Sequence, residues 1–185
     1  MFRPENREDS VRKIIPVVIF LAAFSLFSQK ATLSWGLTLK EGDNLRDLSL
    51  KGLGGEEIHL ASFDGKVVIL TFWSTWCSRC REEMSFLKKI SRSFGDVEII
   101  AVNQEAEEDI NIDEIRNFLE EMGGNFHVAL DEGYRLWDRF GINALPTTVI
   151  LDERGTVRFA ESNFYFASPE KIEETLTKLC KTGNS

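Results

Sequence analysis

The stretch "TFWSTWCSRCREEMSFL", residues 71–87, begins with the pattern of a β-strand and ends with that of an amphipathic helix. Residues 67–73 are almost all β-branched or aromatic, which is typical of a central strand that is covered on both faces. Further on, apolar side chains recur at helical spacing: Met84, Leu87 and Ile90. Cys77 and Cys80 are therefore predicted at the start of a helix, directly after a buried strand.

That position suits thiol chemistry. A cysteine reacts as its thiolate, and a free thiol with a pKa of about 8.5 is mostly protonated at neutral pH. The unpaired N–H groups and the positive dipole end at a helix start favour an anion on Cys77, which we expect to be the nucleophile. Cys80, one turn further in, is placed to attack a mixed disulfide on Cys77. Arg79 adds a cation that is expected to lower the pKa of Cys77.

Two acidic residues follow the second cysteine. Glu83 lies one helical turn after Cys80 and so on the same face. A partly buried carboxylate there is placed to accept the proton of the resolving thiol, with its pKa raised toward the working pH. The alternative is that Glu82 and Glu83 are both solvated acids that stabilise the first turn through the helix dipole.

The rest of the chain predicts one α/β domain. With 185 residues, 43% of them hydrophobic, the chain is long enough for one packed core. A Gly-rich turn at 52–55 between two short apolar-alternating segments predicts a β-hairpin. The remaining expected elements are strands at 67–73, 97–103 and 126–131, a strand pair within 147–160, and helices at 77–94, 112–122, 132–140 and 169–180. A strand, a helix and a strand in succession imply a parallel pair, so we expect a central mixed sheet flanked by helices over residues 38–182.

The first 30 residues differ from this domain. Four basic residues precede the uncharged run 14–28, the pattern of a secretory signal. The run has about 15 residues where a membrane-crossing helix needs roughly 20, yet no A-x-A-like cleavage site follows it. Residues 1–30 are thus expected to be either a signal sequence or an N-terminal membrane anchor. In both cases the domain should be exported, to the periplasm or another extracytoplasmic space.

Charge and cysteine content exclude some functions. Beyond residue 30 the chain carries 17 positive and 27 negative side chains, a surface that should repel nucleic acid.

The third cysteine, Cys180, is expected to be a packed or partly exposed thiol. A zinc site needs about four ligands, and only Cys180, His59 and His127 remain, scattered singly. We therefore expect no metal and no cofactor, and both histidines are expected to be strand residues whose rings have partners.

The motif "FWSTWCSRC" after a buried strand, with "ALPTTVILDERGTV" some 65 residues later, resembles the thioredoxin superfamily. Within it, the chain is similar to the TlpA/ResA-like exported thiol-disulfide oxidoreductases over about residues 40–180. The resemblance implies a thioredoxin-like fold with a cis-proline at Pro146 that faces the dithiol. It also implies that Leu145 and Trp76 contact the substrate.

Three positions help to decide which branch of the thioredoxin superfamily the chain resembles. Arg79 stands where thioredoxin-like proteins commonly have proline, so the first helical turn is less rigid and more positive. Cytosolic thioredoxins have a buried aspartate where this chain has Thr71. Glu83 matches the glutamate that TlpA/ResA-like proteins often have three residues after the second cysteine.

The implied activity is disulfide exchange with protein substrates, with electrons supplied by a membrane or exported donor. The family suggests a reductant, including service to cytochrome c maturation. One alternative is a non-enzymatic copper(I)-binding module or metal chaperone that uses both thiols as soft ligands. Against it, no histidine follows the motif closely, and Met84 is expected at a different angle of the helix from both sulfurs. The other alternative is a thiol peroxidase of the peroxiredoxin type, which commonly lacks such a pair.

Overall fold

A seven-stranded mixed sheet forms the centre of the domain in the computed structural model, which describes residues 36–105, 110–164 and 169–182. The strands are β1 (Ser49–Gly52), β2 (Glu57–His59), β3 (Val67–Trp73), β4 (Val97–Asn103), β5 (His127–Leu130), β6 (Thr147–Leu151) and β7 (Val157–Ser162). Their order is β2-β1-β5-β4-β3-β6-β7. The parallel pairs are β3 with β4 and β4 with β5, and the other neighbours are antiparallel. The predicted mixed sheet and N-terminal hairpin are thus confirmed.

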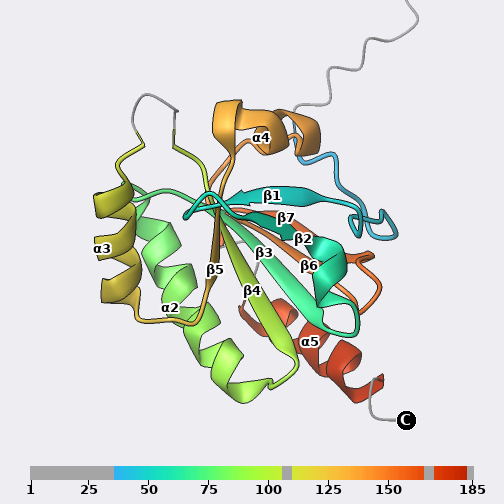
Figure 1. The fold of residues 1–185 in the computed structure, drawn as a ribbon. Helices are drawn as coiled ribbons and strands as arrows, with labels where there is room; N and C mark the ends of the chain where they lie inside the picture. Colours follow the sequence, from blue (N-terminus) through green and yellow to red (C-terminus); the bar gives the residue numbers. More distant parts are fainter. Residues whose placement is uncertain (1–35, 106–109, 165–168, 183–185) are drawn as a thin grey trace, which may run out of the picture. The chain divides into compact units, whose positions relative to one another are not determined.

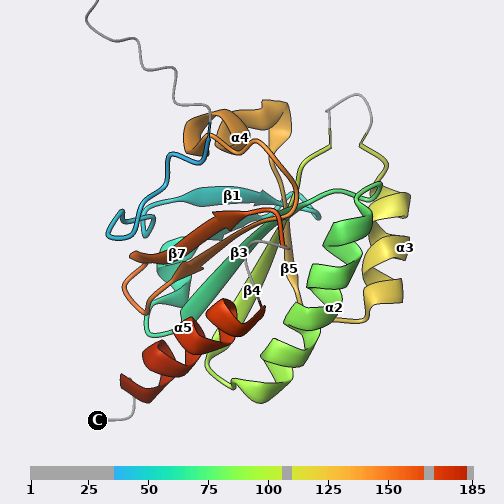
Figure 2. The same cartoon turned by 180° about the vertical axis from the view of Figure 1, so that it is seen from behind.

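Helices cover both faces of this sheet. They are α2 (Ser78–Ser93), α3 (Ile112–Met122), α4 (Arg135–Phe140) and α5 (Pro169–Thr182), with short 3-10 turns η1 (Leu60–Phe63) and η3 (Glu132–Tyr134). Figure 1 shows α2 and α3 side by side, and Figure 2 shows from behind that α5 crosses the same face of the sheet. Helix α4 and the N-terminal segments pack on the opposite face. The sequence had not indicated the 3-10 turn η1, which ends at Phe63 shortly before β3.

The central strand β3 explains why buried side chains pack on both faces of the sheet. All seven of its residues are buried, and alternate side chains point to opposite faces. Val67 and Ile69 pack with α2 and α5, whereas Phe72 and its even-numbered neighbours pack with α4 and the hairpin. Burial of each large apolar side chain stabilises the fold by about 1.5–3 kcal/mol. The same alternation puts Thr71 on the face that carries α2.

The ends of α3 show how the sequence sets helix bounds. The side chain of Asn111 accepts hydrogen bonds from the backbone N–H groups of Asp113 and Glu114, at 3.1 and 3.2 Å. Gly123 ends the helix with a left-handed φ of 59°, a conformation that glycine adopts without cost. The helix has the predicted bounds, 112–122.

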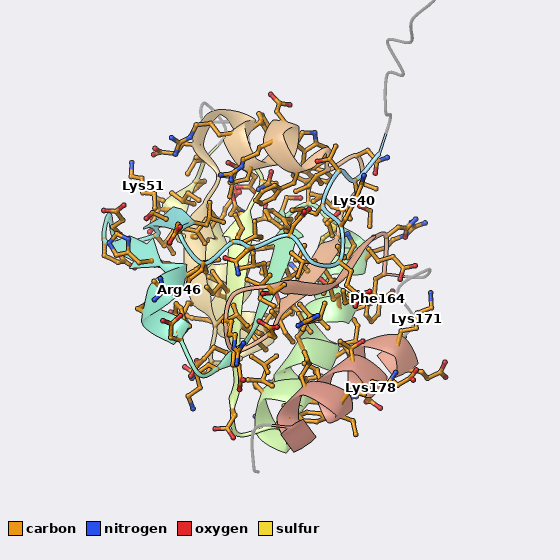
Figure 3. The ribbon with its side chains drawn as sticks, turned by 90° about the vertical axis from the view of Figure 1, so that its right-hand side faces the viewer. Lys40, Arg46, Lys51, Phe164, Lys171 and Lys178 are labelled. Carbon is orange, nitrogen blue, oxygen red and sulfur yellow. A yellow bond between two sulfur atoms is a disulfide. The ribbon has the colours of Figure 1, made fainter. Side chains whose placement is uncertain are left out.

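The outer surface of α5 carries charged side chains. Figure 3 labels two of them, Lys171 and Lys178. Lys171 lies 3.5 Å from Glu161, and Lys178 lies 2.7 Å from Glu174 one turn earlier. Such exposed pairs contribute about 0–1 kcal/mol each, so the buried face of α5, with Ile172 and Leu176, holds the helix on the sheet.

Two predictions concern residues outside the described ranges. One is the N-terminal export segment, and the other is Ser168, which we expect to cap the last helix because it stands directly before Pro169. Within the described ranges, no helix is both long enough and apolar enough to cross a membrane.

Candidate active site

The dithiol lies at the junction that the sequence indicated. Strand β3 ends at Trp73, and Cys77 is the N-cap residue of α2. Cys77 and Cys80 form a disulfide with a Cα–Cα distance of 5.3 Å. The backbone N–H of Cys80 donates to Cys77 Sγ at 3.2 Å, so sulfur takes the place that an oxygen takes in an ordinary helix cap. Cys77 keeps 6% of its surface exposed and Cys80 none, so Cys77 is the more accessible sulfur.

Glu83 is buried completely, more deeply than the partial burial that the sequence suggested. Its carboxylate accepts hydrogen bonds from the hydroxyl groups of Thr71 on β3 and Thr148 on β6. Burial raises the pKa of Glu83 to about 7, and the two threonine hydrogen bonds oppose that rise. The alternative of a solvated acid is therefore wrong for Glu83, while Glu82 is exposed. A buried carboxyl group that titrates near neutral pH lies one turn from the inner cysteine.

Arg79 connects the dithiol turn to the proline loop. Its guanidinium donates from Nη1 to Asn163 Oδ1 at 2.9 Å. The backbone N–H of Asn163 donates in turn to the carbonyl oxygen of Pro146 at 2.7 Å. The Leu145–Pro146 bond is cis, as the resemblance implied. Asn163 thus contacts both segments, and no feature of the sequence had indicated it.

Trp76 and Leu145, the two expected substrate contacts, line one pocket. The pocket has a volume of about 470 Å³ and is completed by Gln104 and by residues of η3 and α4. Trp76 is 73% exposed, and Leu145 also packs against the buried cluster that contains Cys77 and Cys80. Trp73 is fully buried in that same cluster and stacks on Phe118 with ring centroids 4.6 Å apart.

The residues after β4 hold the loop that carries the nucleophile. Glu105 Oε1 accepts hydrogen bonds from both the backbone N–H and the hydroxyl of Thr75. The N–H of Gln104 donates to the carbonyl of Trp73 at 2.7 Å. The sequence reading missed Gln104 and Glu105. Because β3 and β4 were expected to be parallel, the rule that ligands bind at the carboxyl ends of such strands would have indicated both.

The remaining candidate ligands have ordinary surroundings. His59 Nδ1 lies 2.8 Å from Ser49 Oγ, and His127 Nε2 lies 3.2 Å from Glu98 Oε2, so both rings have the expected partners. Cys180 is partly exposed and packs against the α2–α5 core. Burial, and then the charge of Asp96, raise the pKa of its thiol. Among the described residues, no group of three or more acidic, histidine or cysteine side chains is arranged to hold a metal ion.

The expected position of Met84 was wrong. Met84 lies one turn after Cys80 and is fully buried in the same cluster as both cysteines, because residues four apart share a helix face. The argument against copper(I) ligation then rests only on the lack of a histidine near the motif.

A disulfide at a helix start, beside a cis-proline loop and above a mixed sheet, defines a thioredoxin-like exchange centre. The chain matches the AhpC/TSA family over residues 42–160 and belongs to that family. Thiol-disulfide oxidoreductase ResA of Halalkalibacterium halodurans is 31% identical over 150 residues, covering 80% of each chain. ResA of Bacillus subtilis (strain 168) is 31% identical over 146 residues, covering 78% of each chain.

Solved structures agree with this family. A protein assigned as thiol:disulfide interchange protein DsbE from Chlorobium tepidum superposes with a TM-score of 0.68 at 26% identity, over 77% of this chain and 99% of that one. The exposed lipoprotein thioredoxin Etrx1 of Streptococcus pneumoniae gives a TM-score of 0.59 at 25% identity, over 72% and 99%. The fold is therefore thioredoxin-like, and the protein is a thiol-disulfide oxidoreductase with the Cys77–Cys80 pair.

Proposed function

We propose that this enzyme reduces disulfides of exported protein substrates, with Cys77 as nucleophile and Cys80 as resolving thiol. The observation that carries the proposal is the pairing of Cys77 Sγ with the Cys80 N–H at the start of α2. A thiolate at that position gains a charge-assisted hydrogen bond and the positive end of the helix dipole. The 6% of the Cys77 surface that remains exposed gives a substrate access to it, while Cys80 has no exposed surface.

The proposed cycle transfers two electrons from the enzyme dithiol to a substrate disulfide. The Cys77 thiolate attacks one sulfur of a substrate disulfide, forms a mixed disulfide and releases the other substrate sulfur as a thiolate. Cys80 loses its proton and attacks Cys77 Sγ, which forms the Cys77–Cys80 disulfide and releases the second substrate thiolate. The substrate gains two electrons and the enzyme loses two. A membrane or exported dithiol donor returns them.

Glu83 is proposed as the acceptor of the Cys80 proton. A carboxyl group whose pKa is about 7 holds a proton part of the time at neutral pH, which suits a group that must both take and return one. The threonine hydroxyls of Thr71 and Thr148 fix its position. In this proposal Arg79 lowers the pKa of Cys77, and Trp76, Leu145 and Pro146 contact the substrate.

We infer further that residues 1–30 export residues 38–182, and anchor them to the membrane if they are not cleaved. The basic and then apolar composition of that segment supports export, as does similarity to an exposed lipoprotein thioredoxin. Resemblance to the TlpA/ResA branch supports a reductant that acts on apocytochrome c, whose haem-attachment cysteines have the spacing C-x-x-C-H.

A trapping experiment tests the order of the two cysteines. The Cys80→Ser variant should accumulate a stable mixed disulfide between Cys77 and an oxidised C-x-x-C-H peptide, detected by mass spectrometry. The Cys77→Ser variant should form none. Trapping through Cys80 instead would reverse the roles. The reduction potential against glutathione tests direction: a value near thioredoxin's roughly −270 mV favours a reductant, and one near −120 mV an oxidant.

A further inference from the structure

The loop before α2, which carries Cys77, is a β-turn. The backbone N–H of Cys77 donates to the carbonyl oxygen of Ser74 at 3.2 Å and closes the turn at residues 74–77. The register pairing of β3 with β4 has ended just before it, at Trp73. Trp76 is 73% exposed, so its packing does little to hold the turn. The position of the turn therefore depends on a contact from another segment.

Glu105, which follows β4, supplies that contact. Its Oε1 atom accepts hydrogen bonds from the backbone N–H of Thr75, at 2.8 Å, and from the Thr75 hydroxyl. A β-turn uses the N–H of its fourth residue, so the N–H of the second residue is left for a partner outside the turn. The N–H of Glu105 in turn donates to Asn103 Oδ1 at 3.2 Å, the bond of an Asx-turn. These bonds connect the end of β4 to the residue two positions before Cys77.

The burial of Glu105 leaves one of its oxygens unpaired. Glu105 is 5% exposed, and its Oε2 atom has no hydrogen-bond partner in the part of the chain that the structure describes. Burial of a carboxyl group disfavours folding unless hydrogen bonds compensate for the lost water, and an apolar side chain in such a place is often as stable. Stability therefore does not account for an acid at this position, whereas the two bonds to Thr75 do.

We propose that Glu105 is a positioning residue for the nucleophile: it fixes the turn 74–77 so that Cys77 Sγ stays at the first N–H groups of α2. Cys77 Sγ accepts the N–H of Cys80 at 3.2 Å, and this contact favours a thiolate in the reduced protein. A displaced turn moves the sulfur away from that N–H, and more of the thiol is then protonated. The inference rests on the proposed role of Cys77 and adds a residue that acts through Thr75.

Two variants at Glu105 separate its hydrogen bonds from its charge. Glu105→Gln keeps an oxygen that can accept both bonds from Thr75, whereas Glu105→Ala removes both bonds. The two variants have the same net charge. The other charged side chains on the two nearby helices are unchanged in both, namely Arg79, Arg81 and Glu83 on α2 and Glu114 and Glu121 on α3. A difference in Cys77 reactivity between the two variants therefore reports the loss of the hydrogen bonds.

The measurement is alkylation of Cys77 by iodoacetamide in the reduced protein, with the labelled thiol identified by peptide mass spectrometry. At pH 7, Glu105→Gln should react at least as fast as the wild type, because a neutral amide does not oppose a thiolate. Glu105→Ala should react about 10-fold more slowly than Glu105→Gln, equivalent to the loss of one to two hydrogen bonds. At pH 10 the two variants should differ by less than about twofold, since Cys77 is ionised in both.

Equal rates for Glu105→Gln and Glu105→Ala at pH 7 would overturn the proposal. A difference that persisted at pH 10 would overturn it too, because it would reflect access to the sulfur and not stabilisation of the thiolate. Glu114→Ala is the matched control. Glu114 is an exposed acid in the pocket that Thr75 also lines, and its replacement should change the rates by less than about twofold.

Thr75→Val is a second arm that leaves Glu105 in place. It keeps the shape of the side chain and the backbone bond but removes the hydroxyl bond to Glu105, so alkylation at pH 7 should slow about threefold relative to the wild type. An unchanged rate would overturn the proposal even in case Glu105→Ala did not fold. Insulin reduction by the wild type is measured alongside, and its absence would contradict the exchange activity itself.

Discussion

Two cysteines at opposite ends of two helices have opposite surroundings. Cys77 caps the start of α2 and accepts a backbone N–H, whereas Cys180 lies in the last turn of α5 near the charge of Asp96. The helix dipole favours an anion at the first position and disfavours it at the second. The comparison teaches that the position of a cysteine on its helix decides whether its thiol readily becomes a reactive thiolate.

The largest expected effect comes from removing one or the other thiol. Cys77→Ala should abolish insulin reduction, with a loss of at least about 10³-fold, because no other thiolate can start the exchange. Cys180→Ala should leave the rate within about twofold, since the raised pKa of that thiol keeps it protonated. Turbidity during insulin reduction measures both rates. A large loss of rate in Cys180→Ala would show that the thiol at the helix end also takes part in the reaction.

Glu83→Gln should have the next largest effect, on the rate. With the pKa of Glu83 at about 7, resolution by Cys80 in the wild type should speed up as pH rises through 7 and the carboxylate becomes able to accept a proton. The variant lacks this acceptor, so stopped-flow resolution of a mixed disulfide should be about 10²-fold slower at pH 8. Glu82→Gln, at the exposed neighbour, is the control and should keep the wild-type profile.

Glu83→Gln should also change the pH dependence of stability. The pKa of Glu83 is raised on folding, so its stabilising contribution is complete below about pH 4.5 and is lost as pH rises to about 7. That loss is on the order of 3 kcal/mol. Urea unfolding of the oxidised variant should lack this decrease. An equal decrease in the variant would show that another group is responsible.

A smaller effect is expected from the cation in the motif. Arg79→Gln should raise the pKa of Cys77 only slightly, because the guanidinium is exposed and its charge is screened. Iodoacetamide alkylation of reduced protein against pH measures it. Arg81→Gln is the matched control, since Arg81 stacks over Phe118 at 4.4 Å and pairs with Glu121. A larger shift for Arg81 would show that the effect does not depend on the motif position.

The smallest effect concerns Cys180. Asp96→Asn should speed its alkylation by less than about threefold, because burial is the main cause of its raised pKa and Asp96 only the second. Lys66 lies 3.2 Å from Asp96, so Lys66→Met should slow the reaction slightly. If Asp96→Asn slowed the alkylation of Cys180 and Lys66→Met sped it up, nearby charge would not explain the raised pKa of this thiol.

Local patterns predicted most of the elements. The buried strand 67–73, the helix after the dithiol and the helix 112–122 each carry their own periodicity, caps or stop signals, so neighbouring residues alone indicate them. The dithiol position was predictable for the same reason. The exchange chemistry of the two thiols was expected from the same position, whereas the cis-proline and the protein substrates came from the resemblance to a known family.

The rest of the site depends on contacts between distant segments. Thr148 meets Glu83 across 65 positions, and Arg79 meets Asn163 across 84. Such pairs depend on the exact antiparallel register of β6 and β7. The alternation of hydrophobic residues in the sequence does not determine this register to a single residue. Gln104 and Glu105 were missed because they follow the strand pattern as two polar residues before a charged run, which resembles an ordinary solvated loop.

The contact of Asn163 with both Arg79 and Pro146 joins the start of α2 to the loop before β6. The dithiol at the start of α2 and the proline loop before β6 are thereby held at fixed positions relative to each other. A protein chain that docks on the proline side meets the sulfur at a set distance and angle, so alignment for attack is achieved by the enzyme in advance of binding.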